Sequence, residues 1–193
     1  MVYLTMFNDI HNLRILKSAI EHEGLKPYNP PIKLSNGESS DWYVDLKHVL
    51  AVANNLKLVG KCLWSEISNH VNCKSIGGIE TGSISMAAMA AVSGDDNMTT
   101  FYVRKKVKLH GTNKIIEGQL KRPAVLIDDV VTSGQTIAEA AKSMREYNGV
   151  NPALIYAVVY RGDILKLDEI RNRCQTEFRY LFHMSDLKHK PIG

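Results

Sequence analysis

Residues 124 to 136 read AVLIDDVVTSGQT, and the rest of the chain is best understood outward from this run. Its first four residues are small or branched and apolar, which is typical of a strand in a parallel sheet covered on both faces. Two neighbouring aspartates, Asp128 and Asp129, follow, and a turn rich in hydroxyls and glycine leads into a helix pattern. Adjacent carboxylates repel each other. They either cap the next helix as solvated loop residues or face a cation or a ring of hydroxyls.

Strand and helix patterns alternate on both sides of this run. Helical spacing is expected in SISMAAMAAV (83–92) and from Ile137 to a stop at Gly149. The alternation predicts an α/β fold with a doubly wound, mostly parallel sheet. The other strand patterns are KSIGGI (74–79), TTFYVRK (99–105), ALIYAVVY (153–160) and FRYLFHM (178–184).

The first 50 residues read as a small N-terminal hood over one edge of that sheet. A helix is expected to begin after Thr5 or Asn8 and to end at Gly24, before a proline-rich segment. Two strands should follow, at 32–34 and 42–44, and then a helix through Leu56, Val59, Leu63 and Ile67. We expect one domain, 1–193, with a hood at 1–50 and a ligand-binding core at about 70–165.

Composition indicates an ordinary soluble protein. The 193 residues are 45% hydrophobic and 23% charged. Three cysteines without metal-type spacing are typical of reduced thiols in the cytoplasm. We find neither a run of about 20 apolar residues that could span a membrane nor a signal peptide. The predicted location is therefore cytoplasmic, with no membrane partner.

The positive charge is concentrated in one segment, RKKVKLHGTNKIIEG, residues 104–118. It holds five lysines and arginines against one glutamate, which accounts for the whole net charge of +4. A nucleic-acid binder usually spreads its positive charge over a face. Because the positive charge is confined to one segment, we expect a compact polyanion such as a diphosphate as partner. We expect no nucleic-acid partner.

The turn after the acid pair has the features of a phosphate site. Ligands of open α/β sheets bind at the carboxyl ends of the strands, where Asp128 and Asp129 are expected. Gly134 permits close approach, and the start of the helix offers free backbone N–H groups. Thr132, Ser133 and Thr136 add hydroxyl donors. We predict a cradle for a phosphate monoester, with the two acids holding a vicinal diol and a hydrated Mg²⁺.

These motifs resemble those of a known family. VLIDDVVTSGQT is similar to the signature of the type I phosphoribosyltransferases, which bind 5-phosphoribosyl 1-diphosphate (PRPP). RKKVKLHGTNKIIEG resembles the mobile basic loop of the orotate branch, and LSNGESSDWYVDLK resembles its N-terminal substrate segment. With GGIETGS, VVYRGD and MSDLK, the resemblance covers residues 32 to 187 in order.

The resemblance implies a role for each matching position. Lys108, His110, Asp128 and Asp129 would be the catalytic residues, and Glu80, Thr81 and Gly82 the diphosphate turn. Thr132 and Arg161 would contact orotate, and Mg²⁺ would arrive with PRPP and reach the acid pair through water. The implied PRPP contacts are Arg104, Lys105, Lys108, His110, Asp128, Asp129, Val130, Val131, Thr132, Ser133, Gly134, Gln135 and Thr136.

The implied activity is the transfer of the phosphoribosyl group from PRPP to orotate, giving orotidine 5′-monophosphate and diphosphate in pyrimidine biosynthesis. Diphosphate departure builds negative charge on the leaving group, which the basic loop would neutralise while it excludes water. In this family the loop acts in the neighbouring subunit's site, which implies a homodimer.

Two departures leave alternatives open. Ser35 stands where many bacterial relatives have lysine, and Tyr160 stands where aspartate usually precedes the arginine. A phosphoribosyltransferase for another base is therefore an alternative, although Arg161 favours a base with a carboxylate. A second alternative is a non-catalytic regulator that senses PRPP. Such a protein would need a nucleic-acid-binding module, and the first 50 residues show no helix-turn-helix pattern.

Overall fold

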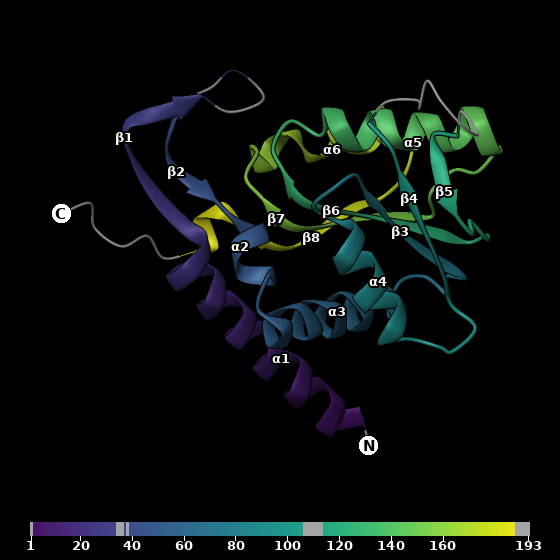
Figure 1. Ribbon diagram of the computed structural model, residues 1–193, viewed down its shortest axis with the longest axis horizontal. Helices are drawn as coiled ribbons and strands as arrows, with labels where there is room; N and C mark the ends of the chain where they lie inside the picture. Colours follow the sequence, from purple (N-terminus) through teal and green to yellow (C-terminus); the bar gives the residue numbers. More distant parts are fainter. Residues whose placement is uncertain (1, 34–36, 38, 106–113, 188–193) are drawn as a thin grey trace.

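The computed structural model describes residues 2–33, 37, 39–105 and 114–187, with the backbone alone for residues 2–8. Its centre is a six-stranded sheet of order β5-β4-β3-β6-β7-β8 (Figure 1). All neighbouring pairs are parallel except β4 and β5. The strands are β3 (Ser75–Ile79), β4 (Thr99–Val103), β5 (Ile116–Gly118), β6 (Ala124–Val131), β7 (Leu154–Tyr160) and β8 (Phe178–His183).

The strand order reverses between β3 and β6. From β3 the chain moves outward to β4 and β5, and it then returns to place β6 on the other side of β3. A crevice forms at such a switch point, because the connections leave the two strand ends in opposite directions. The doubly wound sheet predicted from the sequence is confirmed, and its switch point lies at the acid pair.

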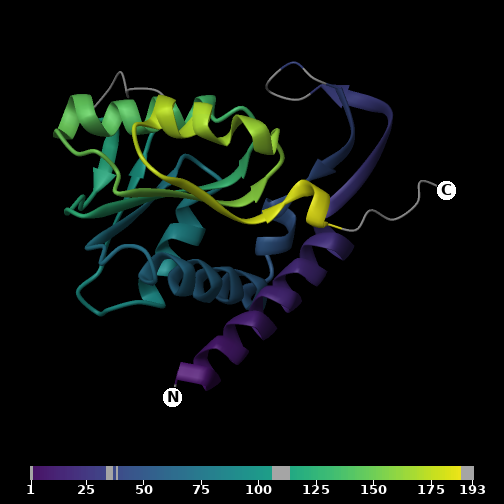
Figure 2. The ribbon, with the colours of Figure 1, turned by 180° about the vertical axis from the view of Figure 1, so that it is seen from behind.

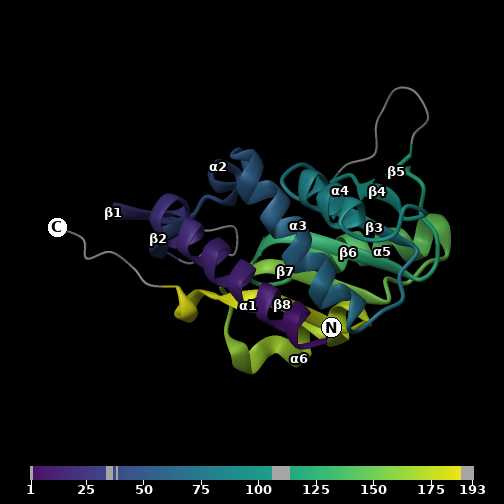
Figure 3. The ribbon, with the colours of Figure 1, turned by 90° about the horizontal axis from the view of Figure 1, so that it is seen from below.

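Helices cover both faces of the sheet. One face carries α1 (Val2–Ala19), α3 (Ala53–Ser68) and α4 (Ile84–Val92), which lie in front of the strands in Figure 3. The other face carries α5 (Gln135–Asn148) and α6 (Leu167–Cys174). Strand β6 serves both layers: Val125 and Ile127 join the core beneath α3, while Ala124 and Leu126 join the core beneath α5. This double burial explains its continuous apolar run.

The hood is a hairpin attached to the end of α1. A π-helical turn, Ile20–Gly24, ends the first helix at the predicted glycine. Strand β1 (Leu25–Lys33) then pairs antiparallel with β2 (Ser39–Val44), followed by the short helix α2 (Leu46–Leu50). The hairpin extends beyond the end of the sheet (Figure 2).

Three expectations about element bounds were wrong, the first being the start of α1, which begins at Val2 rather than after Thr5 or Asn8. The first hood strand begins at Leu25 rather than at 32, and the register shift between Pro27 and Ile32 accommodates its prolines. Strand β6 continues to Val131, because β7 pairs with it up to Val131↔Tyr160, whereas β3 pairs only up to Gly78↔Ile127. The acid pair therefore lies inside β6, beyond its last pair with β3. Helices α2 and α6 were not predicted, nor were the 3₁₀ turns Ile164–Lys166 and Met184–Asp186.

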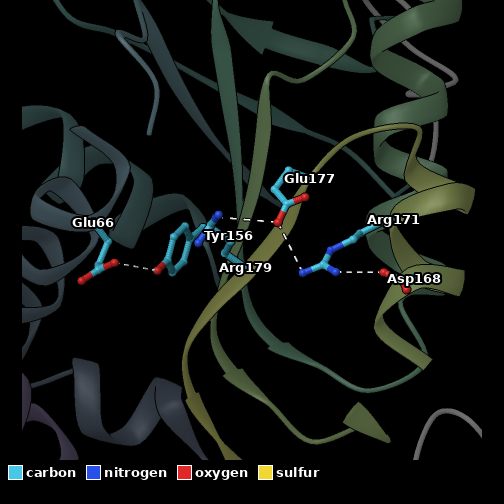
Figure 4. Close-up of polar contacts among 6 residues, drawn as sticks. All are labelled: Glu66, Tyr156, Asp168, Arg171, Glu177 and Arg179. Atoms are coloured by element: carbon cyan, nitrogen blue, oxygen red, sulfur yellow. Dashed lines mark hydrogen bonds and ion pairs between the residues drawn. The ribbon is translucent and has the colours of Figure 1, made fainter. Parts of the chain in front are cut away.

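Charged side chains pair with one another at the outer edge of the sheet, around β8 (Figure 4). The guanidinium of Arg171 lies 2.9 Å from Asp168 and 3.3 Å from Glu177, and Arg179 lies 3.8 Å from the same Glu177 oxygen. Nearby, the Tyr156 hydroxyl donates to Glu66 over 3.2 Å. We call Asp168, Arg171, Glu177 and Arg179 the β8-edge network.

The described part of the chain contains no helix with the length and hydropathy of a membrane span. Its three cysteines, Cys62, Cys73 and Cys174, are buried free thiols.

Candidate active site

A cavity of about 390 Å³ opens at the carboxyl ends of β3 and β6. Side chains from the sheet, the hood and the base of the basic segment meet there. It therefore unites motifs that are far apart in the sequence. The lining residues are Ile32, Lys33, Tyr43, Val44, Asp45, Leu46, Lys47, Ile79, Glu80, Thr81, Gly82, Lys105, Asp128, Asp129, Val130, Thr132, Thr136 and Arg161.

The acid pair is held by hydrogen bonds to one oxygen of each carboxylate. The Ser83 hydroxyl donates to Asp128 Oδ1 over 2.8 Å, and the Asp129 backbone N–H donates to the same oxygen over 3.0 Å. The Val130 N–H donates to Asp129 Oδ1 over 2.8 Å. No further hydrogen bonds to the second oxygens come from described residues, so these oxygens are available for a diol or a hydrated cation.

Asp128 lies in an electrostatically unfavourable position for a carboxylate. Its side chain is buried, with 8% of the residue exposed. Burial, and next the charge of Asp129, raise the pKa of Asp128 to about 7, against the opposing hydrogen bond from Ser83. A cation at this site would favour the ionised form. Such a perturbed carboxylate in a cleft is typical of a functional site.

The turn between β6 and α5 forms a separate small hollow of about 40 Å³. Gly134 precedes α5 with φ of 77°, a backbone conformation that favours glycine, and a Cβ there would come within 3.0 Å of Ile170. Gly134 has no side chain to cap α5, and the Gln135 N–H donates to the Ser133 hydroxyl over 3.4 Å. The other backbone donors of the first turn are available to a ligand. The hollow is lined by Asp128, Val130, Val131, Thr132, Ser133, Gly134, Gln135, Thr136 and Ile137.

The predicted diphosphate turn, Glu80 to Gly82, lines the same cavity as the acid pair and lies directly beside Asp129. The Glu80–Thr81 peptide bond is cis. A Cβ at Gly82 would overlap Asp129 Oδ2 and would come within 3.3 Å of Lys47 Cε. Glycine at this position therefore allows the turn, the acid pair and Lys47 to approach one another closely.

Arg104 is engaged at the base of the basic segment and lines a different hollow, of about 160 Å³. Its guanidinium lies 3.8 Å from Glu80 and 3.4 Å from Glu117, and it donates to the Tyr102 hydroxyl over 3.0 Å. The next residue, Lys105, lines the main cavity. The structure thus brings Lys105 to the site and places Arg104 beside it. The predicted residues Lys108 and His110 lie outside the described residues.

Arg161 joins the hood to the core. It follows β7 and lines the cavity, where its guanidinium donates to Ser40 Oγ over 2.9 Å and to the Trp42 carbonyl over 3.1 Å. Both acceptors belong to β2. The guanidinium is therefore oriented by the hairpin.

Of the two departures from the family pattern, the structure describes Tyr160. Tyr160 is fully buried and donates its hydroxyl to the Asp163 carbonyl over 2.7 Å. Its ring packs against Phe178 and Tyr180, and it is absent from the described lining of the main cavity. Tyr160 is thus a core residue in this fold. Ser35 lies outside the described residues.

The sequence predicted no individual role for four residues of the site, although Tyr43 and Lys47 lie in LSNGESSDWYVDLK and Ser83 ends GGIETGS. Lys33, Tyr43 and Lys47 line the cavity from the hood, and Ser83 supports Asp128 from behind. Nothing in the spacing of the hood residues showed which of them face the core. The Gly-Ser pair before α4 was a usable signal for Ser83, because a hydroxyl between a strand end and a helix often binds a neighbouring polar group.

No preassembled metal cage is present among the described residues: nowhere do three or more His, Cys, Asp or Glu side chains gather around one point. Mg²⁺ commonly binds through one or two carboxylates together with substrate phosphates and water. Asp128 and Asp129 supply two carboxylates of this kind on one side of the cavity. The donor set therefore fits a hydrated Mg²⁺ that arrives with a phosphate ligand.

The chain is similar in sequence to curated orotate phosphoribosyltransferases. It is 39% identical over 155 residues to the enzyme of Aquifex aeolicus, which is 77% of this chain and 83% of that protein. It is 34% identical over 133 residues to the enzyme of Pyrococcus horikoshii, which is 67% of this chain and 70% of that protein. No family model matches the chain.

Solved structures confirm the expected fold. A phosphoribosyltransferase from Corynebacterium diphtheriae has a TM-score of 0.77 at 22% identity and covers 92% of this chain and 98% of its own. The orotate phosphoribosyltransferase of Mycobacterium tuberculosis, in complex with PRPP, has a TM-score of 0.69 at 19% identity, with 91% and 98% covered. At these identities the likeness establishes the architecture alone.

Proposed function

This chain belongs to the orotate phosphoribosyltransferase family, and we propose that its cavity carries out the family's reaction. The reaction transfers the 5-phosphoribosyl group of PRPP to orotate and yields orotidine 5′-monophosphate and diphosphate in pyrimidine biosynthesis. The observation that carries the proposal is the meeting of Asp128, Asp129 and the Glu80–Gly82 turn with Arg161 in one cavity. These groups match the diol, the diphosphate and the carboxylate of the two substrates.

The acid pair is assigned to the ribose of PRPP. Asp128 and Asp129 accept hydrogen bonds from its two hydroxyls with their second oxygens. Asp128 and Asp129 would also hold a hydrated Mg²⁺, which would supply positive charge against the diphosphate. Ser83 keeps Asp128 in place during turnover, because its hydrogen bond is buried beneath the site.

The β6–α5 turn is assigned to the 5′-phosphate. The open backbone N–H groups at the start of α5 and the positive end of its dipole both favour a bound anion. Thr132, Ser133 and Thr136 contribute hydroxyls. Because this turn belongs to the rigid core of the sheet, it fixes the ribose while the other end of the substrate reacts.

Arg161 is assigned to the orotate carboxylate. A planar guanidinium binds a carboxylate through two parallel hydrogen bonds, which selects against a base that lacks the group. The alternative, a phosphoribosyltransferase for another base, has no comparable use for an arginine held at this point by Ser40 and Trp42. The second alternative, a non-catalytic regulator that senses PRPP, does not explain why an arginine lines the cavity.

The basic segment is assigned to the leaving group. Its two ends are held beside the cavity, because β4 pairs with β5 and the Arg104 N–H donates to the Ile115 carbonyl over 2.8 Å. Lys108 and His110 would neutralise the departing diphosphate, His110 either as proton donor or as a hydrogen-bonding cation. We propose that the segment acts in the partner subunit of a homodimer, in accordance with the family resemblance.

The domain organisation and the cellular location are proposals as well. The single domain 1–193 is supported by the shared core that links α1 and the hood to the sheet. A cytoplasmic location is supported by the three free thiols, since such thiols persist in a reducing compartment.

The test is turnover of orotate with PRPP and Mg²⁺ beside a panel of other bases. Orotate should be the base consumed, and Lys108→Ala should lower turnover by about 100-fold or more, by analogy with lost oxyanion donors. Arg161→Ala should chiefly raise the KM for orotate. Tight binding of PRPP without diphosphate release under any base would favour the regulator instead.

A further inference from the structure

We propose that Lys47 binds the diphosphate of PRPP as a fixed cation supplied by the hood. The inference rests on the proposed function. It assigns a contact to Lys47, the last residue of LSNGESSDWYVDLK, for which the resemblance named no individual role. Lys47 would bind the substrate at the same site as the basic segment, but it belongs to helix α2 of the hood. Three observations support it: the position of Lys47 between two hollows, its proximity to the diphosphate turn, and the pairing of Arg104 with Glu80 and Glu117.

Lys47 lies at the boundary between the main cavity and a second hollow of about 370 Å³. The second hollow lies against the same turn as the main cavity. From this position the exposed Lys47 side chain can reach an anion at the turn without any movement of α2. The residues shared by the two linings are Leu46, Lys47, Thr81, Gly82 and Asp129.

The end of the Lys47 side chain reaches the diphosphate turn itself. Its Cε lies 3.3 Å from the point that a Cβ at Gly82 would occupy, beside Asp129 Oδ2. The backbone of α2 is fixed at this place: the Asp45 carboxylate accepts a hydrogen bond from the His48 N–H over 3.2 Å, and Leu46 is 2% exposed. The short helix is therefore anchored in the core, and Lys47 extends from it toward the turn.

The distribution of charge leaves this lysine available. Arg104 is paired with Glu80 and Glu117. The ion pairs formed within the described ranges do not include Lys47. A diphosphate brings several negative charges close to the acid pair, and the backbone N–H groups of the turn supply no full positive charge. A lysine ammonium is a compact point charge that suits a phosphate oxygen.

The test compares ligands with and without the diphosphate. Binding of PRPP, inorganic diphosphate and ribose 5-phosphate is measured by calorimetry for the parent, Lys47→Met and Lys47→Arg. The methionine keeps an unbranched apolar stem for packing. Lys61→Ala is the matched control, because this exposed lysine of α3 lines none of the hollows described above.

Lys47→Met should weaken PRPP and diphosphate by about 10- to 100-fold, the range of a lost charge-assisted hydrogen bond. Ribose 5-phosphate should bind as it does to the parent, and Lys47→Arg should recover part of the loss. Equal weakening of PRPP and ribose 5-phosphate, or no weakening of either, would overturn the proposal. If the parent binds PRPP but consumes no base, the proposed function fails while the contrast between these ligands still decides the role of Lys47.

Discussion

Two groups of charged side chains on the sheet differ in how the protein balances their charges. In the β8-edge network each charged group has a counterion from the chain: Arg171 has Asp168 and Glu177, and Arg179 has Glu177. In the acid pair two carboxylates are adjacent, and the ion pairs of the described residues include neither. The first arrangement is complete without a ligand. The second is unfavourable until a ligand brings hydroxyls or positive charge.

The comparison separates two uses of charge on one sheet. The network is partly exposed, with side chains of Arg171 and Glu177 35% and 43% exposed, so that water screens its ion pairs. Asp128 is buried, so that its charge is screened little and its pKa rises. An unfavourable charge retained in a buried position is a better indicator of a ligand site than a satisfied one.

The largest expected effect comes from an isosteric change at the acid pair. Asp128→Asn should lower turnover by about 100-fold or more, because the amide cannot supply a second anionic oxygen to the diol and the cation. The same change should leave the thermal midpoint unchanged or raise it, since it removes like-charge repulsion in a buried place. Kinetics and thermal unfolding of the purified variant measure both.

The matched control is Glu177→Gln, the same chemical change in the β8-edge network. It should leave turnover at the parental value. Parental turnover in Asp128→Asn, or a marked loss of stability there, would place Asp128 among the structural charges and remove the contrast.

The pH dependence of stability sharpens the contrast further. The pKa of Asp128 lies near 7 in the folded chain, above its ordinary value of 3.8. A raised pKa means that the folded state holds the proton more tightly, so Asp128 destabilises the fold progressively as pH rises from about 4 to about 7. Above that range the contribution is constant. The free energy of unfolding of the parent, minus that of Asp128→Asn, should fall across this window; a flat difference would contradict the raised pKa.

A smaller effect is expected where the hood orients Arg161, the arginine proposed to bind the base. Ser40→Ala removes the 2.9 Å hydrogen bond that positions Arg161. Because the Trp42 carbonyl remains as an acceptor, the KM for orotate should rise by about 5- to 10-fold, equivalent to about 1 kcal/mol. The KM for PRPP should stay near its parental value. Ser40→Thr, which keeps a hydroxyl, should restore much of the affinity; a rise shared by both substrates would indicate a general loss of hood structure.

The smallest effect is expected beside the network. Tyr156→Phe removes the hydroxyl that donates to Glu66 and should lower the free energy of unfolding by about 1 kcal/mol, with unchanged turnover. Denaturant titration and steady-state kinetics test the two parts separately. A change in kcat for this variant would mean that the two charged regions are coupled through β7.

The sequence predicted the core of the fold because local signals were strong there. The apolar run of β6 and the glycine at position 134 required a buried strand and a tight turn, and both occur. The length of β6 was underestimated because hydropathy stops at Ile127, whereas pairing with β7 continues through the two acids. That continuation depends on a strand 30 residues later, which no local pattern shows.

The cavity combines residues for which the sequence predicted a role with residues for which it predicted none. The acid pair and Arg161 lie in contiguous motifs, and the structure brings them into one cavity. Lys47 and Ser83 reach the same place through the docking of α2 and the start of α4. Both residues end motifs that were recognised in the sequence, but their individual contacts depend on tertiary packing, which spacing along the chain does not show.

The hydrogen bonds from Arg161 to the hairpin also bear on how such a protein diversifies. The proposed selector for the acceptor base is assembled from two stretches separated by about 120 residues in sequence, and the proposed phosphate cradle includes neither hydrogen bond. On this proposal, mutations in the hairpin would alter the base specificity and leave the binding of the sugar donor unchanged. Substitutions in strand β2 would then change the acceptor base during evolution while the binding site for the sugar donor stays the same.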